Sequence, residues 1–363
     1  MLKKSGFMPK YSIIVPVFNR PDEVDELLAS LTQQSYHDFE VVLVEDGSSK
    51  PCKEVADRYA PGLDLHYYSK ENSGPGPSRN YGVERAHGEY VIILDSDVVL
   101  PEGYLAAVDR SLKEHPCDAF GGPDRAHESF TDMQKAISYS MTSFFTTGGI
   151  RGGKAKLDKF HPRSYNLGVK REVYNALGGF SKMRFGEDID FSYRILESGY
   201  TTRLYPDAWV WHKRRTNLDK FFKQVFNSGI ARINLTKRHP GTLKLVHLLP
   251  MVFTIGVICL ILAAVVMRLA ALSPSASECF REGFPLGKTH IGWWTLPLLP
   301  IILYILLVFI DSTIRNRSAV IGYLSIKSSF VQLFGYGFGF LTAWWKRCVL
   351  RKSEFSAFEK NFY

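Results

Sequence analysis

Short apolar runs alternate with amphipathic segments over the first part of the chain, up to about residue 212. A buried strand is predicted over residues 11–18, and a helix follows from Pro21, a residue suited to a first helical turn. Four apolar residues of this helix recur at the spacing of one helical face: Val24, Leu27, Leu28 and Leu31. Three more strands are predicted, over residues 40–46, 63–69 and 91–94. The alternation of strands and helices predicts an α/β domain with a mostly parallel, Rossmann-like sheet.

Two uncharged apolar stretches of 20 residues follow this domain, at 248–267 and 291–310. A helix of that length crosses the hydrocarbon layer of a bilayer, which is about 30 Å thick. Trp293 and Trp294 stand where an interfacial aromatic belt is expected. Both stretches are therefore predicted to be transmembrane helices.

A third apolar segment, residues 319–345, differs because it contains Lys327 and is followed by basic residues at 346–352. Arg315 and Arg317, after the second stretch, indicate a cytoplasmic end by the positive-inside tendency. A further crossing would move the basic tail to the other side of the membrane. We therefore expect this segment to be re-entrant or interfacial, on the cytoplasmic side.

The composition of the 363 residues is that of a folded protein, with 22% charged residues and a formal net charge of +9. Much of the positive charge lies between residues 203 and 238, which suits a membrane surface or a phosphate-rich ligand, and we expect no nucleic-acid partner. Within this stretch, residues 217–238 mix apolar and basic positions. They predict an amphipathic helix that lies on the membrane surface or, alternatively, packs on the α/β domain.

Two acidic residues, Asp95 and Asp97, follow the fourth predicted strand, with Ser96 between them. A strand that stops on two carboxylates places both at the carboxyl edge of the sheet, where ligands bind in open α/β folds. Carboxylates at this spacing can hold Mg²⁺ or Mn²⁺ against a diphosphate. His212 is either a third metal ligand or a structural histidine.

Other polar groups follow the remaining strand ends. Glu45 and Asp46 end the second strand, and a carboxylate there can accept a base N–H or a ribose hydroxyl, or it can serve as a turn or cap residue. The Gly/Pro-rich loop at 73–80 enters a helix N-terminus, which favours anions. Its Arg79 could contact diphosphate or ribose, or lie on an exposed helix surface.

Asp188 stands at the start of a further predicted helix. Near a nucleotide pocket it could act as a general base, and helix capping is the alternative. Three residues are predicted to form the apolar stripe of this helix: Ile189, Tyr193 and Leu196. The segment 148–164, rich in glycine and lysine, is predicted to be a mobile loop over an acceptor.

Together these segments resemble the family 2 glycosyltransferases, inverting enzymes with a GT-A fold, over roughly residues 10–215. The resemblance rests on six motifs in the order of the family: IIVPVFN, VEDGS, GPGPSRNYG, LDSD, GGF and GEDIDFSYR. It implies a nucleotide-diphospho-sugar donor and a divalent cation, Mg²⁺ or Mn²⁺.

The resemblance also implies roles for individual residues. Asp188 would be the catalytic base, Asp97 would bind the metal, and Asp46 would contact the nucleotide base. The remaining donor contacts are expected at the strand ends and loops: Pro16, Val17, Phe18, Asn19, Glu45, Arg79, Asp95 and Ser96. Many members have Asp where Glu45 stands, so the base contact is expected mainly of Asp46.

The activity expected from this resemblance is inverting transfer of one sugar to a hydroxyl of a glycan or lipid-linked acceptor, in cell-envelope polysaccharide biosynthesis. Processive synthases that resemble this family carry a Gln-x-x-Arg-Trp motif. The nearest sequence here, from Gln224 to Asn227, lacks Arg-Trp, which predicts a non-processive enzyme. One alternative is a sugar nucleotidyltransferase that makes the donor, although no lysine-bearing Gly-rich loop lies near the N-terminus. The other is a catalytically degenerate membrane scaffold, against which the intact acidic residues argue.

Three parts of the chain are therefore predicted. Residues 1–215 form the GT-A domain, residues 216–244 a basic juxtamembrane segment, and residues 245–363 a membrane domain. The five cysteines are widely spaced and include no CxxC pair, which indicates reduced thiols. We expect a multi-pass protein of the bacterial inner (cytoplasmic) membrane, with the catalytic domain in the cytoplasm.

Overall fold

A seven-stranded sheet forms the centre of the N-terminal domain, with the strand order β3-β2-β1-β4-β8-β6-β9. Its strands are β1 (Tyr11–Val17), β2 (Phe39–Asp46), β3 (Leu65–Lys70), β4 (Tyr90–Leu94), β6 (Ala119–Gly121), β8 (Asn166–Lys170) and β9 (Thr202–Leu204). Every neighbouring pair is parallel except those that β8 makes with β4 and β6. The predicted mostly parallel sheet is confirmed. The computed structural model describes residues 8–125, 130–147, 160–183, 185–213, 215–273, 277–278, 280, 283–286 and 289–358.

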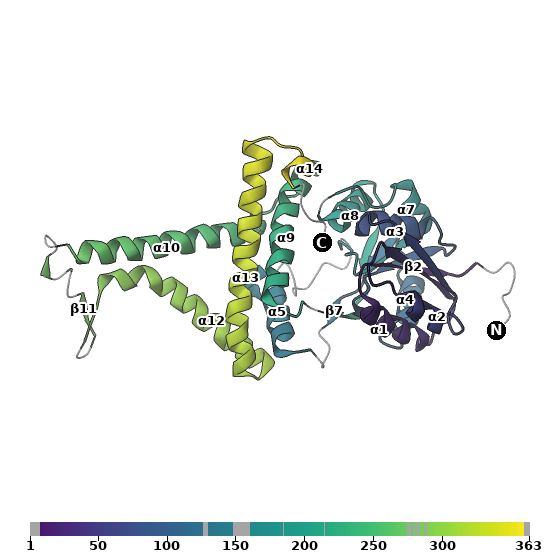
Figure 1. Ribbon diagram of the computed structural model, residues 1–363, viewed down its shortest axis with the longest axis horizontal. Helices are drawn as coiled ribbons and strands as arrows, with labels where there is room; N and C mark the ends of the chain where they lie inside the picture. The colour runs from purple at the N-terminus through teal and green to yellow at the C-terminus, as the bar shows by residue number, and fades with distance from the viewer. Residues whose placement is uncertain are drawn as a thin grey trace.

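Helices cover both faces of this sheet (Figure 1). One face packs against α1 (Pro21–Thr32), α2 (Lys53–Tyr59) and α4 (Tyr104–Glu114), and the other against α3 (Pro75–Val83), α7 (Arg171–Ala176) and α8 (Glu187–Glu197). Both faces of the central strands are therefore buried, which explains their near-continuous apolar sequence. The predicted apolar face of α1 is confirmed, because Val24, Leu27, Leu28 and Leu31 are all buried.

The apolar stripe predicted for α8 is only partly confirmed, because Ile189 and Tyr193 pack against the apolar cluster of Met183, Ala231 and Leu235 without being fully buried. Phe191 and Ile195 are the apolar residues that this helix buries, whereas Ile189, Tyr193 and Leu196 are only partly buried. The reason is that the first turn of α8 directs its acidic residues toward the interior, where they find ionic partners. The helix is therefore rotated about its axis relative to the orientation that would bury Ile189, Tyr193 and Leu196.

A second, three-stranded sheet joins distant segments at one edge of the domain. It consists of β5 (Val98–Val99), β10 (Val210–His212) and β7 (Asp124–Arg125), with β10 in the centre. In the antiparallel β5–β10 pair, His212 is opposite Val98. This register brings His212 beside Asp97, 115 positions earlier in the sequence.

The C-terminal part is a set of long helices that leads away from the sheet (Figure 1). Its elements are α9 (Leu218–Arg238), a 3₁₀ turn η1 (Leu245–His247), α10 (Leu249–Ala271), the hairpin β11 (Phe284–Leu286) and β12 (Thr289–Ile291), a 3₁₀ segment η2 (Trp293–Leu298), α12 (Leu299–Asn316), α13 (Ala319–Trp344), a π turn η3 (Trp345–Val349) and α14 (Glu354–Ala357). Within the described residues, two helical segments are long and apolar enough to cross a membrane, Leu249–Ala271 and Trp293–Asn316. Only 22% and 6% of their apolar windows are buried in the protein, unlike the core helix of a soluble domain.

Helix α13 lies between the α/β domain and the two apolar helices (Figure 1). It is one continuous helix, and it runs alongside α9 while α10 and α12 extend away on its other side. Ser328 of α13 donates to the Ala136 carbonyl of α5 (Asp132–Thr142) over 2.8 Å, and Ser312 of α12 donates to Ser325 of α13 over 2.7 Å. These contacts join the apolar helices to the domain that precedes them.

Helices α9 and α13 approach each other at backbone distance. A Cβ added at Gly339 would lie 2.0 Å from the Phe226 carbonyl oxygen, and one added at Gly229 would lie 2.2 Å from the Tyr336 carbonyl oxygen. Only glycine fits at both positions. Most apolar residues of α9 are buried, several of them against α5 and α13, although Phe222 is 38% exposed. This corresponds to the alternative of a helix packed on protein.

Candidate active site

Two adjoining cavities open at the carboxyl ends of the central strands. The smaller, of about 280 Å³, is lined by Pro16, Val17, Phe18, Arg20, Asp46, Pro75, Asp95, Ser96, Asp97 and Arg215. The larger, of about 860 Å³, shares Arg20, Pro75, Asp97 and Arg215 with the smaller one, and Asn19 and Asp188 also line it. The structure therefore brings most of the sequence-predicted site residues to one place, although they come from segments far apart in the chain.

A group suited to a divalent cation lies where the two cavities meet. The side-chain ligand atoms of Asp95, Asp97 and His212 all lie within 4.8 Å of one another. His212 Nε2 is 3.2 Å from Asp97 Oδ1, which is buried and accepts no hydrogen bond. Tyr165 stacks on the His212 ring with 5.1 Å between ring centroids, which fixes its orientation. Two carboxylates and an imidazole are a ligand set that fits Mn²⁺ or Mg²⁺.

Cationic side chains surround the same carboxylates. Arg20 is paired with Asp97 Oδ2, and Arg215 Nη1 lies 3.8 Å from that oxygen. Burial alone would raise the pKa of Asp97, but His212 and Arg20 outweigh it and hold the pKa well below its ordinary value. Asp97 is thus ionised at neutral pH, while Arg20 and Arg215 are placed to meet a diphosphate.

Asp46 and Glu45 have different environments although they are adjacent. Asp46 lines the smaller cavity, and its carboxylate accepts hydrogen bonds from Lys70 Nζ over 2.6 Å and from the Gly74 N–H over 2.9 Å. The Glu45 carboxylate turns inward, is 1% exposed, and accepts from the Cys52 N–H over 2.7 Å. Glu45 thus holds the turn after β2 and lines neither cavity, whereas Asp46 faces the space where a donor would lie.

Arg79 lies beneath the site and is only 4% exposed. Its guanidinium bridges Asp95, over 2.8 Å, and Glu187 on α8, over 2.9 Å. It is not a surface residue, and it lines neither cavity. Arg79 therefore connects the acidic pair after β4 with the helix that carries Asp188, and its contact with the nucleotide stays a prediction.

Asp188 opens into the larger cavity from the first turn of α8. Its Oδ2 accepts from Arg163 Nε over 2.7 Å, and its Oδ1 accepts from the Ile189 N–H over 2.9 Å. Burial would raise the pKa of this carboxyl, but Arg163 and then Arg79 outweigh it and lower the pKa below its ordinary value. Asp188 is therefore a carboxylate at neutral pH, in position to accept a proton from a group in the cavity.

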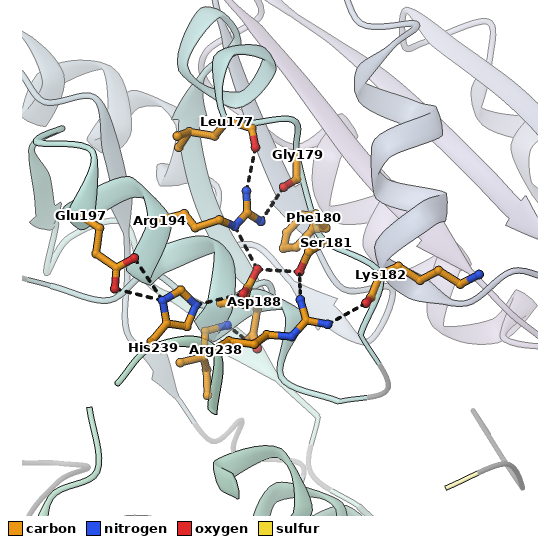
Figure 2. A network of polar contacts seen from close by, with 12 residues as sticks. Leu177, Gly179, Phe180, Ser181, Lys182, Asp188, Arg194, Glu197, Arg238 and His239 are labelled. Carbon is orange, nitrogen blue, oxygen red and sulfur yellow. Dashed lines mark hydrogen bonds and ion pairs between the residues drawn. The ribbon is translucent and has the colours of Figure 1, made fainter. Parts of the chain in front are cut away.

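A polar network fixes α8 against the end of α9 (Figure 2). Asp190 accepts from Ser181 over 2.6 Å and from Arg194 over 3.0 Å, and it lies 3.0 Å from His239 Nε2. His239 Nδ1 lies 2.9 Å from Glu197, at the other end of the helix. The helix that presents Asp188 is thus held at both ends.

Several residues of the site were not predicted from the sequence: Arg20, Arg163, Arg215 and His239. Arg20 directly follows the first motif, and this position was the one feature of the sequence that could have identified it as a site residue. The predicted loop over the acceptor lies outside the described residues at positions 148–159, and Arg163 belongs to its described end. Nothing local in the sequence indicates that Arg163 pairs with Asp188.

Comparison with known proteins supports the family resemblance of the sequence. A family model described as Glycosyl transferase family 2 matches residues 12–178. Glycosyltransferase AglE of Haloferax volcanii is 24% identical over 265 residues, which cover 69% of this chain and 81% of that protein. The GalNAc(5)-diNAcBac-PP-undecaprenol beta-1,3-glucosyltransferase of Campylobacter jejuni is 33% identical over 117 residues, 31% of this chain and 38% of that enzyme. Some longer relatives are covered over as little as 13% of their length.

A solved structure has the same fold. The mannosyltransferase PcManGT from Pyrobaculum calidifontis, determined in complex with GDP-Man and Mn²⁺, superposes with a TM-score of 0.59 at 19% sequence identity. The match covers 91% of this chain and 88% of that one. The fold class predicted from the sequence, a GT-A-type α/β domain followed by apolar helices, is confirmed.

Proposed function

From the glycosyl transferase family 2 domain of this chain, we propose that the protein is a sugar-transferring enzyme. It transfers one sugar from a nucleotide-diphospho-sugar to a hydroxyl of a glycan or lipid-linked acceptor, and the configuration at the anomeric carbon is inverted. The observation that carries the proposal is the junction of the two cavities. The smaller one ends at Asp95 and Asp97, which form a metal-suited group with His212 behind the wall, and the larger one leads from Asp97 to Asp188. A donor and an acceptor can therefore meet between a metal-suited group and a base.

The donor diphosphate is placed at the shared wall of the cavities. Arg20 and Arg215 would bind its oxygens, and Asp95, Asp97 and His212 would hold Mg²⁺ or Mn²⁺ beside them. When bound, the cation neutralises the charge that develops on the departing nucleoside diphosphate. Asp46, in the smaller cavity with residues 16–18, would receive the base or ribose of the nucleotide.

Asp188 would act from the acceptor side. Its carboxylate removes the proton of the acceptor hydroxyl as that oxygen attacks the anomeric carbon, and the bond to the diphosphate breaks on the opposite face. A positioned base contributes about 10²–10⁴-fold to the rate. Arg163, bonded to Asp188, holds the carboxylate ionised until the hydroxyl arrives. This order of groups supports an inverting reaction, and the absence of Arg-Trp after Gln224-Val-Phe supports the addition of a single sugar.

Attachment to a membrane is part of the proposal. The exposed apolar helices Leu249–Ala271 and Trp293–Asn316 support two crossings, and the basic residues near α9 and α13 support a cytoplasmic catalytic domain. The position of α13 between α9 and these helices supports its interfacial placement. We propose a bacterial inner membrane protein of cell-envelope glycan synthesis.

The test is metal-dependent donor binding by the purified full chain. A panel of nucleotide sugars, including UDP- and GDP-linked sugars, is screened by thermal shift with and without Mn²⁺. We expect one donor to raise the melting midpoint only when Mn²⁺ is present, and Asp97→Ala to abolish that rise. Asp57 is an exposed acid on α2, so the control Asp57→Asn should leave the rise intact. Requirement for a nucleoside triphosphate would instead indicate a nucleotidyltransferase, and no binding or turnover would indicate a scaffold.

A further inference from the structure

The larger cavity extends well past Asp188, along α9 and up to the apolar helices. Its far wall is made by His247 of η1, by Pro250 in the first turn of α10, and by Gln332 and Tyr336 in α13. Immediately beyond, Leu245 is 83% exposed and Leu249 is 49% exposed. One continuous space thus connects the predicted base with the point where an apolar, outward-facing surface begins.

Three cations of α9 line this space without an ionic partner. Lys220, Lys223 and Arg232 take part in none of the ion pairs found in the described part of the chain, whereas Arg163 and Arg215 of the same wall face Asp188 and Asp97. Arg232 is the most constrained of the three. Its Nη1 is 3.3 Å from the Tyr193 hydroxyl, and its Nε is buried without a hydrogen-bond partner. An uncompensated, partly desolvated guanidinium is costly unless an anion binds to it.

Two histidines near these cations have a lowered pKa, mainly because they are buried and further because of the cations. Burial and then Arg232 and Lys244 lower the pKa of His247 to about 4. Burial followed by Lys244, Arg163 and Arg232 also lowers the pKa of His161. Both imidazoles are therefore neutral at physiological pH, so the local charge that an incoming anion meets is that of the arginines and lysines.

The cations are spread along the helix rather than clustered at one point. From Lys220 to Arg232 the rise of an α-helix is about 18 Å. Arg232 lies at the end near His247 and the apolar helices, and Lys220 and Lys223 lie in the first two turns of α9. A ligand that uses this space has a negative group near the membrane end and a body that extends toward Asp188.

We propose that the acceptor is a lipid with a phosphate or diphosphate headgroup. Arg232 binds this headgroup, and Lys220 and Lys223 attract it. The hydrocarbon chain of the lipid leaves past His247 and Pro250 into the bilayer. This inference rests on the proposed function and narrows its acceptor to an anionic lipid. The cavity then serves as the passage by which a membrane-bound substrate presents to Asp188 a hydroxyl of the sugar linked to its headgroup.

The test measures binding without catalysis. The full chain in detergent, with EDTA and without donor, is titrated by calorimetry with farnesyl diphosphate, inorganic diphosphate and farnesol. We expect farnesyl diphosphate to bind at least tenfold more tightly than either of the others. Arg232→Gln should weaken that binding at least tenfold, and the double variant Lys220→Gln with Lys223→Gln should weaken it less. Lys237 is an exposed lysine of the same helix outside the cavity, so Lys237→Gln should leave the binding unchanged.

Two outcomes overturn the inference. If inorganic diphosphate binds as tightly as farnesyl diphosphate, the site takes a soluble anion and the lipid assignment is wrong. If Arg232→Gln leaves farnesyl diphosphate binding unchanged while Mn²⁺-dependent donor binding shows the variant to be folded, the assigned headgroup site is wrong. Asp97→Ala separates the two proposals, because it should abolish donor binding and leave lipid binding intact. Lipid binding in a wild type that binds no nucleotide sugar would count against the proposed function alone.

Discussion

Replacement of Asp188 by asparagine tests the centre of the proposed reaction. Asparagine has the same shape, so its carbonyl oxygen can still accept from the Ile189 N–H, now at 2.9 Å, while the proton-accepting charge is lost. Loss of a positioned base lowers the rate by about 10²–10⁴-fold, which at about 1.4 kcal/mol per tenfold raises the barrier by about 3–5 kcal/mol. Donor binding should persist, because Asp188 does not line the smaller cavity.

The effect of this substitution on stability should be much smaller than its effect on rate. The partner Arg163 is 34% exposed, so leaving its charge unpaired costs about 1 kcal/mol rather than the several expected for a fully buried pair. Nucleoside diphosphate release and product formation are measured at saturating donor, together with the donor KM and the melting temperature. The matched control is Asp57→Asn, which makes the same chemical change on an exposed helix.

Two results would refute this reasoning. Turnover within threefold of wild type would show that Asp188 is not the base. A parallel loss of donor binding and turnover would show that its role lies in the donor pocket or in folding.

Three further predictions follow from particular contacts. Arg163→Gln should move the acid limb of the pH–rate profile to higher pH, because Arg163 holds the pKa of Asp188 below its ordinary value and burial alone would raise it. Rates measured between about pH 5 and about pH 8 would show this shift, and superimposable profiles of variant and wild type would contradict it. His212→Gln should weaken Mn²⁺-dependent donor binding at least about tenfold, and unchanged Mn²⁺ titrations would remove it from the ligand set. Gly339→Leu should destabilise the protein by about 1–3 kcal/mol or more, because the added Cβ would lie 2.0 Å from the Phe226 carbonyl oxygen and force α9 and α13 apart. The melting temperature in detergent should fall accordingly, and an unaltered melting temperature would show that the helices can separate at little cost.

Much of the fold follows from local sequence. The buried strands and α1 could be predicted because apolar spacing and Pro21 are properties of a few neighbouring residues. The position of Asp95 and Asp97 at the sheet edge follows in the same way, since the parallel strands of an α/β sheet all end on the ligand-binding side. Residues 248–267 and 291–310 could be identified by length and apolarity alone, and the corresponding helical segments begin slightly later and end further on, at Leu249–Ala271 and Trp293–Asn316.

The partners of the charged residues could not be predicted in this way. Glu45 and Asp46 are adjacent, yet only the packing of β2 against the following turn decides that one is structural and the other faces a cavity. Arg79 is part of a motif, but its bridge to Glu187 depends on how α3 and α8 meet.

The sequence by itself therefore determined the order of strands and helices, the apolar segments and the set of acidic residues available for chemistry. Only the tertiary structure decided that His212 lies beside Asp97, that Arg163 pairs with Asp188, and that the cations of α9 face a cavity. The physical reason is range: apolar periodicity acts between residues a few positions apart, whereas an ion pair or a cavity wall depends on chain segments that meet only after the sheet and helices have packed.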